Sequence, residues 1–219
     1  MRVKICGLTN EADARQAIEA GADALGINLF PGSKRYVALE TVLPWVKELP
    51  LFVERVAVMV NPTYEEVLQV MGSGAFGLVQ LHGDEPPGFC EKLVADEGLR
   101  VIKALPLRGR DDFEKIFEYE KMGLSALLVD AYVPGEFGGT GKLIDLEVAA
   151  ELAHQRLRIP LILSGGLHPE NVAGAVEKVR PYAVDVASGV EGATPRNKDF
   201  AKLRAFVAGA NQGAFGPVI

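Results

Sequence analysis

Two side chains that can move protons stand at the ends of apolar segments far apart in the chain. Cys6 closes the run at residues 3–6, and Asp130 closes the run at residues 126–130. A thiolate can take a proton and a carboxyl group can give one, so the two groups could serve acid–base catalysis on one small substrate. That chemistry requires a fold that brings both segment ends to the same place.

Each of these residues also has a purely structural interpretation. An isolated cysteine is more often a small packing residue than a catalyst, and Cys90, which lies in a helical pattern, is best explained in that way. A carboxylate at the end of an apolar strand is costly without partners, so Asp130 is either held by structural hydrogen bonds or acts on a substrate. Position in the fold decides between these interpretations.

Short apolar, β-branched segments recur along the chain with amphipathic segments between them. The apolar runs lie at residues 3–6, 24–29, 55–60, 77–81, 101–104, 126–130, 161–164 and 184–187. Strands that are apolar on both faces indicate a parallel sheet, and the spacing between them indicates helices. Eight alternating units predict an α/β fold: a single (β/α)8 TIM barrel with eight parallel strands over residues 1–219, with a tail at about 209–219 that is expected to fray.

In a barrel of this kind the active site lies at the carboxyl ends of the strands. Only residues at those ends and in the loops that follow are therefore candidates for chemistry. They are Cys6, Asn28, Arg35, Asn61, Gln80, His82, Asp130, Gly138, Gly165 and residues 185–189.

Two glycine loops, at residues 164–166 and 187–189, follow the last two predicted strands. Glycine lets backbone N–H groups crowd around an anion, and a helix N-terminus adds partial positive charge. Either loop alone could be a simple tight turn, but loops after strands seven and eight are the usual phosphate site of these barrels. We therefore expect a phosphate site formed by Gly165, Gly166, Ser188 and Gly189.

Three further features could serve a ligand. Arg35, after the second predicted strand, could clamp a carboxylate with two parallel hydrogen bonds, although a surface salt bridge is the simpler alternative. His82, after the fourth strand, could contact a ligand or brace its own loop. The glycine-rich segment 135–142 could move as a lid over the mouth of the barrel.

Composition excludes several classes of function. A net charge of −6 argues against a nucleic-acid binder, and no apolar run approaches membrane-spanning length. The start of the chain leads straight into a strand, so we expect no signal peptide and a cytoplasmic location. Two cysteines and no spaced histidine–carboxylate set predict no disulfide and no metal site. The expected partner is a small phosphorylated molecule, and the protein could be a monomer or a homodimer.

Five parts of the sequence together resemble the phosphoribosylanthranilate isomerase family of the tryptophan pathway, from the first strand to the last. These parts are residues 4–7; 33–37; 79–83; Asp130 with 138–141; and 164–167 with 169–172 and 185–191. The first and the last are distinctive of that family, whereas the glycine loops alone would fit many phosphate-binding barrels.

The resemblance implies an isomerase of tryptophan, and so of aromatic amino-acid, biosynthesis. Its reaction is an Amadori rearrangement, without a cofactor, of N-(5-phosphoribosyl)anthranilate to 1-(2-carboxyphenylamino)-1-deoxyribulose 5-phosphate. By analogy Asp130 is the general acid that opens the furanose to a Schiff base, Cys6 is the general base that removes the C2 proton, and Arg35 holds the anthranilate carboxylate. The predicted substrate contacts are Arg35, Gln80, His82, Gly165, Gly166, Asp185, Ser188 and Gly189.

The chain departs from the family pattern in one place that bears on packing. Ile144 and Leu146 flank Asp145, where the family often has an aromatic pair, so we expect different packing beneath the lid. Two alternative functions stay open. Another phosphosugar isomerase, such as the histidine-pathway aminoaldose isomerase, would use two aspartates, and Cys6 argues against it. A non-catalytic phosphate-ligand binding protein would need neither Cys6 nor Asp130.

Overall fold

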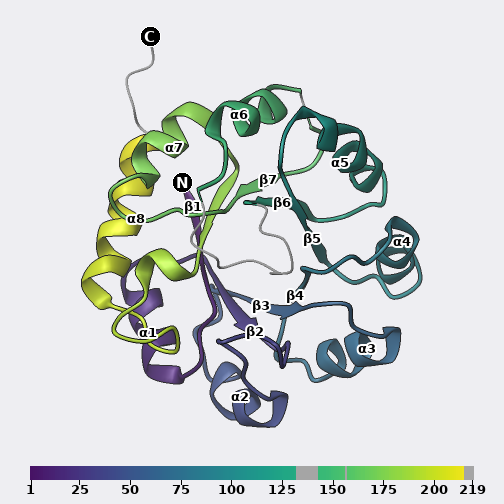
Figure 1. The fold of residues 1–219 in the computed structure, drawn as a ribbon. Coiled ribbons are helices and arrows are strands. Elements are labelled where there is room, and N and C mark those ends of the chain that lie inside the picture. The colour runs from purple at the N-terminus through teal and green to yellow at the C-terminus, as the bar shows by residue number, and fades with distance from the viewer. Residues whose placement is uncertain (132–142, 156, 215–219) are drawn as a thin grey trace.

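The computed structural model describes residues 1–131, 143–155 and 157–214. Within them, parallel strands close into one barrel in sequence order, and helices surround it (Figure 1). The strands are β1 (Arg2–Cys6), β2 (Ala24–Asn28), β3 (Glu54–Met59), β4 (Leu78–Leu81), β5 (Val101–Pro106), β6 (Ala126–Asp130), β7 (Leu161–Leu163) and β8 (Ala183–Val186). The predicted eight-stranded α/β barrel is confirmed.

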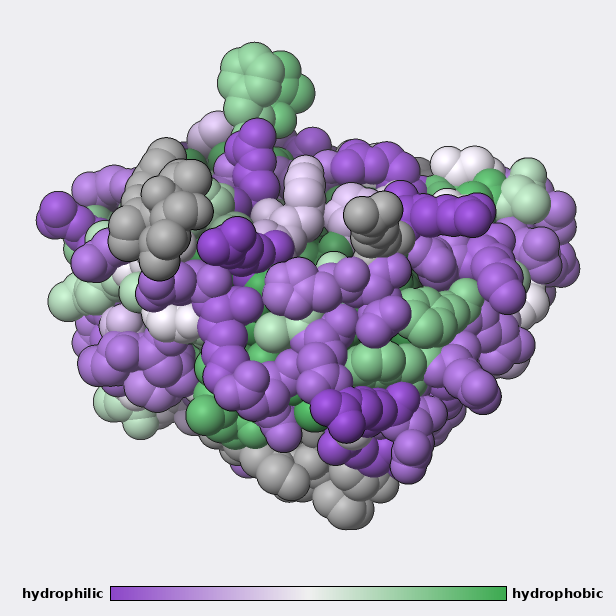
Figure 2. Space-filling model, turned by 90° about the horizontal axis from the view of Figure 1, so that it is seen from above, coloured by the Kyte–Doolittle hydropathy of each residue, from purple (hydrophilic) through white to green (hydrophobic). Residues whose placement is uncertain are grey.

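The helices alternate with the strands as the spacing of apolar residues predicts. They are α1 (Glu11–Glu19), α2 (Leu39–Val46), α3 (Tyr64–Gly72), α4 (Pro87–Ala95), α5 (Phe113–Glu120), α6 (Leu146–His154), α7 (Val172–Val179) and α8 (Phe200–Ala214), with 3₁₀ turns η1 (Arg110–Asp112) and η2 (Ser188–Val190). Among the described helices, none has both the length and the apolar character needed to cross a bilayer. The surface seen in Figure 2 is mostly hydrophilic, with apolar residues in separate patches.

The expectation of a fraying tail from about residue 209 is not met up to residue 214. Helix α8 continues to Ala214 and packs against α7. Leu203, Phe206, Val207 and Ala210 recur at helical spacing and are buried, which explains why the helix persists. Residues 215–219 lie outside the described residues, and so does the segment 135–142, including Gly138, that was predicted to act as a lid.

Inside the barrel, alternate residues of each strand face the axis, and their character changes along the strands. The lower part is an apolar cluster of Val56, Leu78, Ile102, Ala104, Ala126, Leu128, Ile162 and Ala183. Two residues further along the same strands the inward positions become polar, as Leu128 gives way to Asp130 and Ala183 to Asp185. The polar groups at the carboxyl ends therefore rest on an apolar floor.

Residues 144–146, where the chain departs from the family pattern, lie at the start of α6. The Asp145 side chain accepts hydrogen bonds from the N–H groups of Glu147 and Val148, which starts α6. Ile144 is buried, and its N–H donates to the carbonyl of Gly165 at 3.3 Å. The start of α6 is thereby tied to the glycine loop after β7.

Candidate active site

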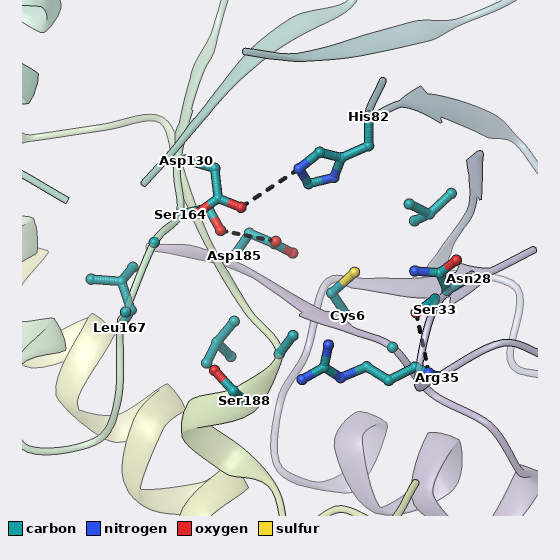
Figure 3. A pocket seen from close by; sticks show the side chains of 16 residues that line it. Cys6, Asn28, Ser33, Arg35, His82, Asp130, Ser164, Leu167, Asp185 and Ser188 are labelled. Atoms are coloured by element: carbon teal, nitrogen blue, oxygen red, sulfur yellow. Dashed lines mark hydrogen bonds and ion pairs between the residues drawn. The ribbon is translucent and has the colours of Figure 1, made fainter. Parts of the chain in front are cut away.

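One pocket at the carboxyl ends of the strands collects most of the predicted site residues (Figure 3). Cys6 from β1 and Asp130 from β6 both line it, so the thiol and the carboxyl group share one cavity. The other predicted residues in its wall are Arg35, His82, Gly165, Gly166, Asp185 and Ser188. Asn28 and Ser33 line it as well. Gln80 and Gly189 are not among the lining residues.

Cys6 sits at the end of β1 among charged groups. Burial raises the pKa of its thiol, the positive charge of Lys4 lowers it, and Asp185 raises it again. Lys198 adds a weaker lowering effect. Burial thus favours the neutral thiol, while two ammonium groups make its deprotonation easier than burial alone would allow.

Asp130 has both carboxylate oxygens in defined positions. Oδ1 accepts the N–H of Ala131 at 2.7 Å, and Oδ2 lies 3.5 Å from Nε2 of His82. Gly165, with a φ of 94°, passes so close that a Cβ there would lie 3.0 Å from Oδ1 and 2.7 Å from the nitrogen of Ala131. Only glycine allows this approach, which brings the loop after β7 against the carboxyl group.

Gln80 and His82 form a second layer behind Asp130. Gln80 is completely buried, and its Nε2 lies 2.9 Å from Nδ1 of His82. If the amide donates, Nδ1 accepts and the ring hydrogen stands on Nε2, facing Asp130. Gln80 is not among the residues that line the pocket, and its hydrogen bond is with His82; its predicted contact with substrate stays a prediction.

Arg35 reaches the pocket across the end of β1. A Cβ at Gly7 would lie 2.2 Å from Cδ of Arg35, so the arginine stem occupies the place of a side chain at position 7. Its Nε donates to Oε1 of Glu191 at 2.5 Å. The guanidinium group is then seen between Cys6 and Ser188 in Figure 3. Glu191 fixes the plane of the guanidinium group, whose parallel N–H donors are predicted to bind a carboxylate.

The two glycine loops pack against each other. Gly165 and Gly166 both have positive φ, at 94° and 64°. A Cβ at Gly189 would lie 2.0 Å from the carbonyl oxygen of Leu167, so Gly189 serves the close packing of the loops. Gly189 is not among the residues that line the pocket, and its predicted part in the phosphate site stays a prediction.

Two lysines near Cys6 were not singled out from the sequence. Lys4 could have been found, because it stands two residues before Cys6 on a strand and must share its face. Lys198 comes from the segment before α8, where no local pattern indicates a site. Its Nζ donates to the carbonyl of Ala187 at 2.9 Å, and burial lowers its pKa to about 8.

The described residues contain no group of three or more His, Cys, Asp or Glu side chains arranged to hold a metal ion.

Comparison with known proteins identifies the family. The family model described as N-(5'-phosphoribosyl)anthranilate isomerase matches residues 3–209. The chain belongs to this family. A relative with this name from Trichlorobacter lovleyi is 45% identical over 212 residues, covering 97% of this chain and 98% of the relative. One from Thermotoga maritima is 43% identical over 210 residues, covering 96% and 98%.

Solved structures of the family have the same fold. The crystal structure of phosphoribosyl anthranilate isomerase from Thermotoga maritima is similar with a TM-score of 0.87 and 41% identity, over 96% of this chain and 98% of that one. A second isomerase structure, in complex with reduced 1-(o-carboxyphenylamino)-1-deoxyribulose 5-phosphate, gives a TM-score of 0.84 and 40% identity over the same shares. The predicted family is confirmed.

Proposed function

We propose that this chain converts N-(5'-phosphoribosyl)anthranilate to 1-(2-carboxyphenylamino)-1-deoxyribulose 5-phosphate, a step of tryptophan biosynthesis. Family membership supports the overall reaction. The observation that carries the mechanism is the shared pocket, in which the thiol of Cys6 and the carboxyl group of Asp130 come from strands on different sides of the barrel. A substrate between them can receive one proton and lose another.

Asp130 is the general acid of the first step. Its carboxyl group gives a proton to the ring oxygen of the ribose, the bond between C1 and that oxygen breaks, and the nitrogen lone pair forms the C=N bond of a protonated Schiff base. Ala131 and His82 hold the two oxygens of Asp130 in place for this transfer. Orientation of this kind keeps the proton directed at a single atom.

Cys6 is the general base of the second step. Its thiolate removes the proton from C2, the C–H electrons form the C1=C2 bond, and the C=N electrons return to nitrogen. The product is an enolamine, which becomes the ketone when C1 gains a proton and the C2 hydroxyl loses one. Each step is a proton transfer, and none needs an oxidant or a reductant.

The ends of the substrate match the ends of the pocket. The phosphate fits the wall made by Gly165, Gly166 and Ser188, where backbone N–H groups and the start of η2 favour an anion. The anthranilate carboxylate fits Arg35, whose fork can form two parallel hydrogen bonds. The pentose then spans the space between Cys6 and Asp130.

A fluorescence assay with freshly made substrate tests this function. The purified chain should remove the fluorescence of the anthranilate substrate catalytically, with Cys6→Ala as the blank. Binding of the substrate without turnover would support a non-catalytic phosphate-binding protein instead. Turnover of the histidine-pathway aminoaldose in preference to the anthranilate compound would favour the related isomerase. The cytoplasm remains the predicted location.

We also propose that two copies of the chain associate through the amino-terminal end of the barrel. Phe52 and Leu51, between α2 and β3, are 94% and 79% exposed, which is unusual for large apolar side chains. They border a hollow whose wall includes Val56 and Ile102 and which is large enough to accept such side chains. A structure in the family concerns monomers made from the dimeric Thermotoga maritima enzyme, which supports a second copy as the occupant.

The oligomeric state tests this association. Light scattering should give the mass of a dimer for the unmodified chain and the mass of a monomer for Phe52→Asp. The variant should keep its turnover number, since the catalytic pocket lies at the other end of the strands. A monomeric unmodified chain at micromolar concentration would contradict the proposal.

A further inference from the structure

Lys4 is a buried charged residue to which the proposed reaction gives no role. It is 3% exposed, and its Nζ lies 2.7 Å from Oδ1 of Asp185. The two residues are register partners on β1 and β8, so the barrel itself sets their separation. Oδ2 of Asp185 also accepts a hydrogen bond from Ser164 at 3.3 Å. A buried ion pair is seldom a net source of stability, so its presence beside a catalytic pocket calls for another explanation.

Strand geometry brings Lys4 to Cys6. Residues two apart on a strand point to the same face, so both side chains enter the barrel. Both also lie over Gly26, the register partner of Cys6 on β2. A Cβ at Gly26 would lie 2.8 Å from Sγ of Cys6 and 3.0 Å from Nζ of Lys4. The absence of a side chain at position 26 leaves the space in which the ammonium group and the sulfur meet.

We infer that Lys4 is a positioning residue that stabilises the thiolate of Cys6, and that Asp185 keeps Lys4 charged for this purpose. The inference rests on the proposed role of Cys6 as the base. Lys4 acts through Cys6, since the pocket wall contains Cys6 and Asp185 whereas Lys4 is buried beneath them. An ammonium group on the inner side of the sulfur leaves the outer side open to the C2 proton.

The electrostatics of the pair agree with this geometry. Burial opposes the charge of Lys4, but the carboxylate of Asp185 and the sulfur of Cys6 together raise the pKa of Lys4 above its ordinary value. Lys4 therefore stays protonated at neutral pH. Its charge lowers the pKa of the Cys6 thiol more than that of Lys198 does.

Other charged groups also face Cys6. Arg35 crosses Gly7 beside it and Glu191 holds Arg35, while His82 and Asp130 face it across the pocket. These groups are left unchanged when Lys4 is replaced. A comparison of variants at position 4 thus isolates the contribution of one ammonium group.

The test measures the ionisation of the thiol without using turnover. In a Cys90→Ala background, the rate of Cys6 alkylation by iodoacetamide is followed by mass spectrometry as a function of pH. Lys4→Met, which keeps the length and removes the charge, should move the midpoint upward by about one pH unit or more. Alkylation at neutral pH should slow by about tenfold. The rising limb of kcat/KM against pH should move by the same amount.

Two further variants complete the test. Lys4→Met with Asp185→Asn removes both charges, so it avoids an unpaired buried carboxylate and serves if the single variant does not fold. Its midpoint should lie above that of the unmodified chain by less than in the single variant, because Asp185, whose charge raises the thiol pKa, is lost as well. Lys198→Met should give a smaller shift. An unchanged midpoint in the double variant, or a larger shift from Lys198→Met, would overturn the inference. Full turnover in Cys6→Ala would instead remove the proposed role of Cys6 as the base, whatever the midpoint.

Discussion

The two cysteines of this chain are both buried but differ in their position relative to the pocket. Cys6 is 9% exposed at the end of β1, and Cys90 is fully buried in α4. Burial raises the pKa of both thiols, and it raises the pKa of Cys90 to about 11. Only Cys6 lines the pocket, with Lys4 beside it and Asp130 across from it. Low exposure therefore does not distinguish a packing cysteine from a base. A nearby ammonium group does not either, because Lys103 lowers the pKa of Cys90 as Lys4 lowers that of Cys6; the position of the thiol in the pocket wall does.

The largest expected difference between the two thiols is in turnover. Cys6→Ala should lower kcat by about a thousandfold, because the group that takes the C2 proton is lost. Cys90→Ala should leave kcat within about twofold, since its side chain lies in the helical shell. Steady-state fluorescence assays of both variants provide the measurement. Comparable losses in both would show that Cys6 has no special chemical role.

Asp130→Asn should have the next largest effect. The amide keeps the shape of the side chain but cannot give up a proton to the ring oxygen, so kcat should fall by about a hundredfold or more. Affinity for inorganic phosphate, followed by calorimetry, should change little, because the glycine loops are intact. If this variant retained most of its turnover, Asp130 would have only a structural role.

Variants of Arg35 should change substrate binding more than the chemical step. Arg35→Ala removes the fork beside Cys6, so KM should rise by about tenfold or more while kcat falls less. Arg35→Lys keeps the charge without the fork and should recover only part of the affinity. Initial rates over a range of substrate concentrations give both constants. An unchanged KM in Arg35→Ala would remove the arginine from the binding site.

The smallest effect concerns the stability conferred by Cys90 in alkaline solution. Its thiol pKa is raised to about 11 in the folded chain, whereas an unfolded cysteine ionises near pH 9. Between these values the unfolded chain has lost the proton that the folded chain retains, so the free energy of unfolding should fall by up to about 1.4 kcal/mol per pH unit. The free energy of unfolding of Cys90→Ala, measured with urea, should not show this decrease with pH. Parallel curves for both proteins from pH 9 to 11 would contradict the expected shift.

The fold was predictable because the local patterns agree with the global architecture. Apolar runs of strand length alternate with amphipathic segments throughout, and each observed strand begins and ends within two residues of its prediction. The tail was predicted less well. The prediction gave more weight to the glycine and polar residues after Ala210 than to the apolar helix face that continues up to it. Packing against α7 nevertheless keeps α8 helical to Ala214.

The site residues that stand directly at the carboxyl ends of strands could be predicted from the sequence. Cys6, Asp130 and the glycine loops follow strands directly, so the barrel rule brings them together. Gln80 and Gly189 follow the same rule and yet do not line the pocket, because Gln80 is completely buried and Gly189 packs against the carbonyl of Leu167. Lys198 lowers the pKa of Cys6 from a segment without any repeating pattern. The sequence gives no sign that these two residues come near each other in the fold.

A crystal structure with reduced 1-(o-carboxyphenylamino)-1-deoxyribulose 5-phosphate, the compound present in one solved relative, tests the central claim most directly. The account predicts Sγ of Cys6 within about 3.5 Å of C2 and the carboxyl group of Asp130 at hydrogen-bonding distance from the oxygen on C4. A compound bound with its phosphate at the glycine loops, but with either group directed away from the pentose, would contradict it.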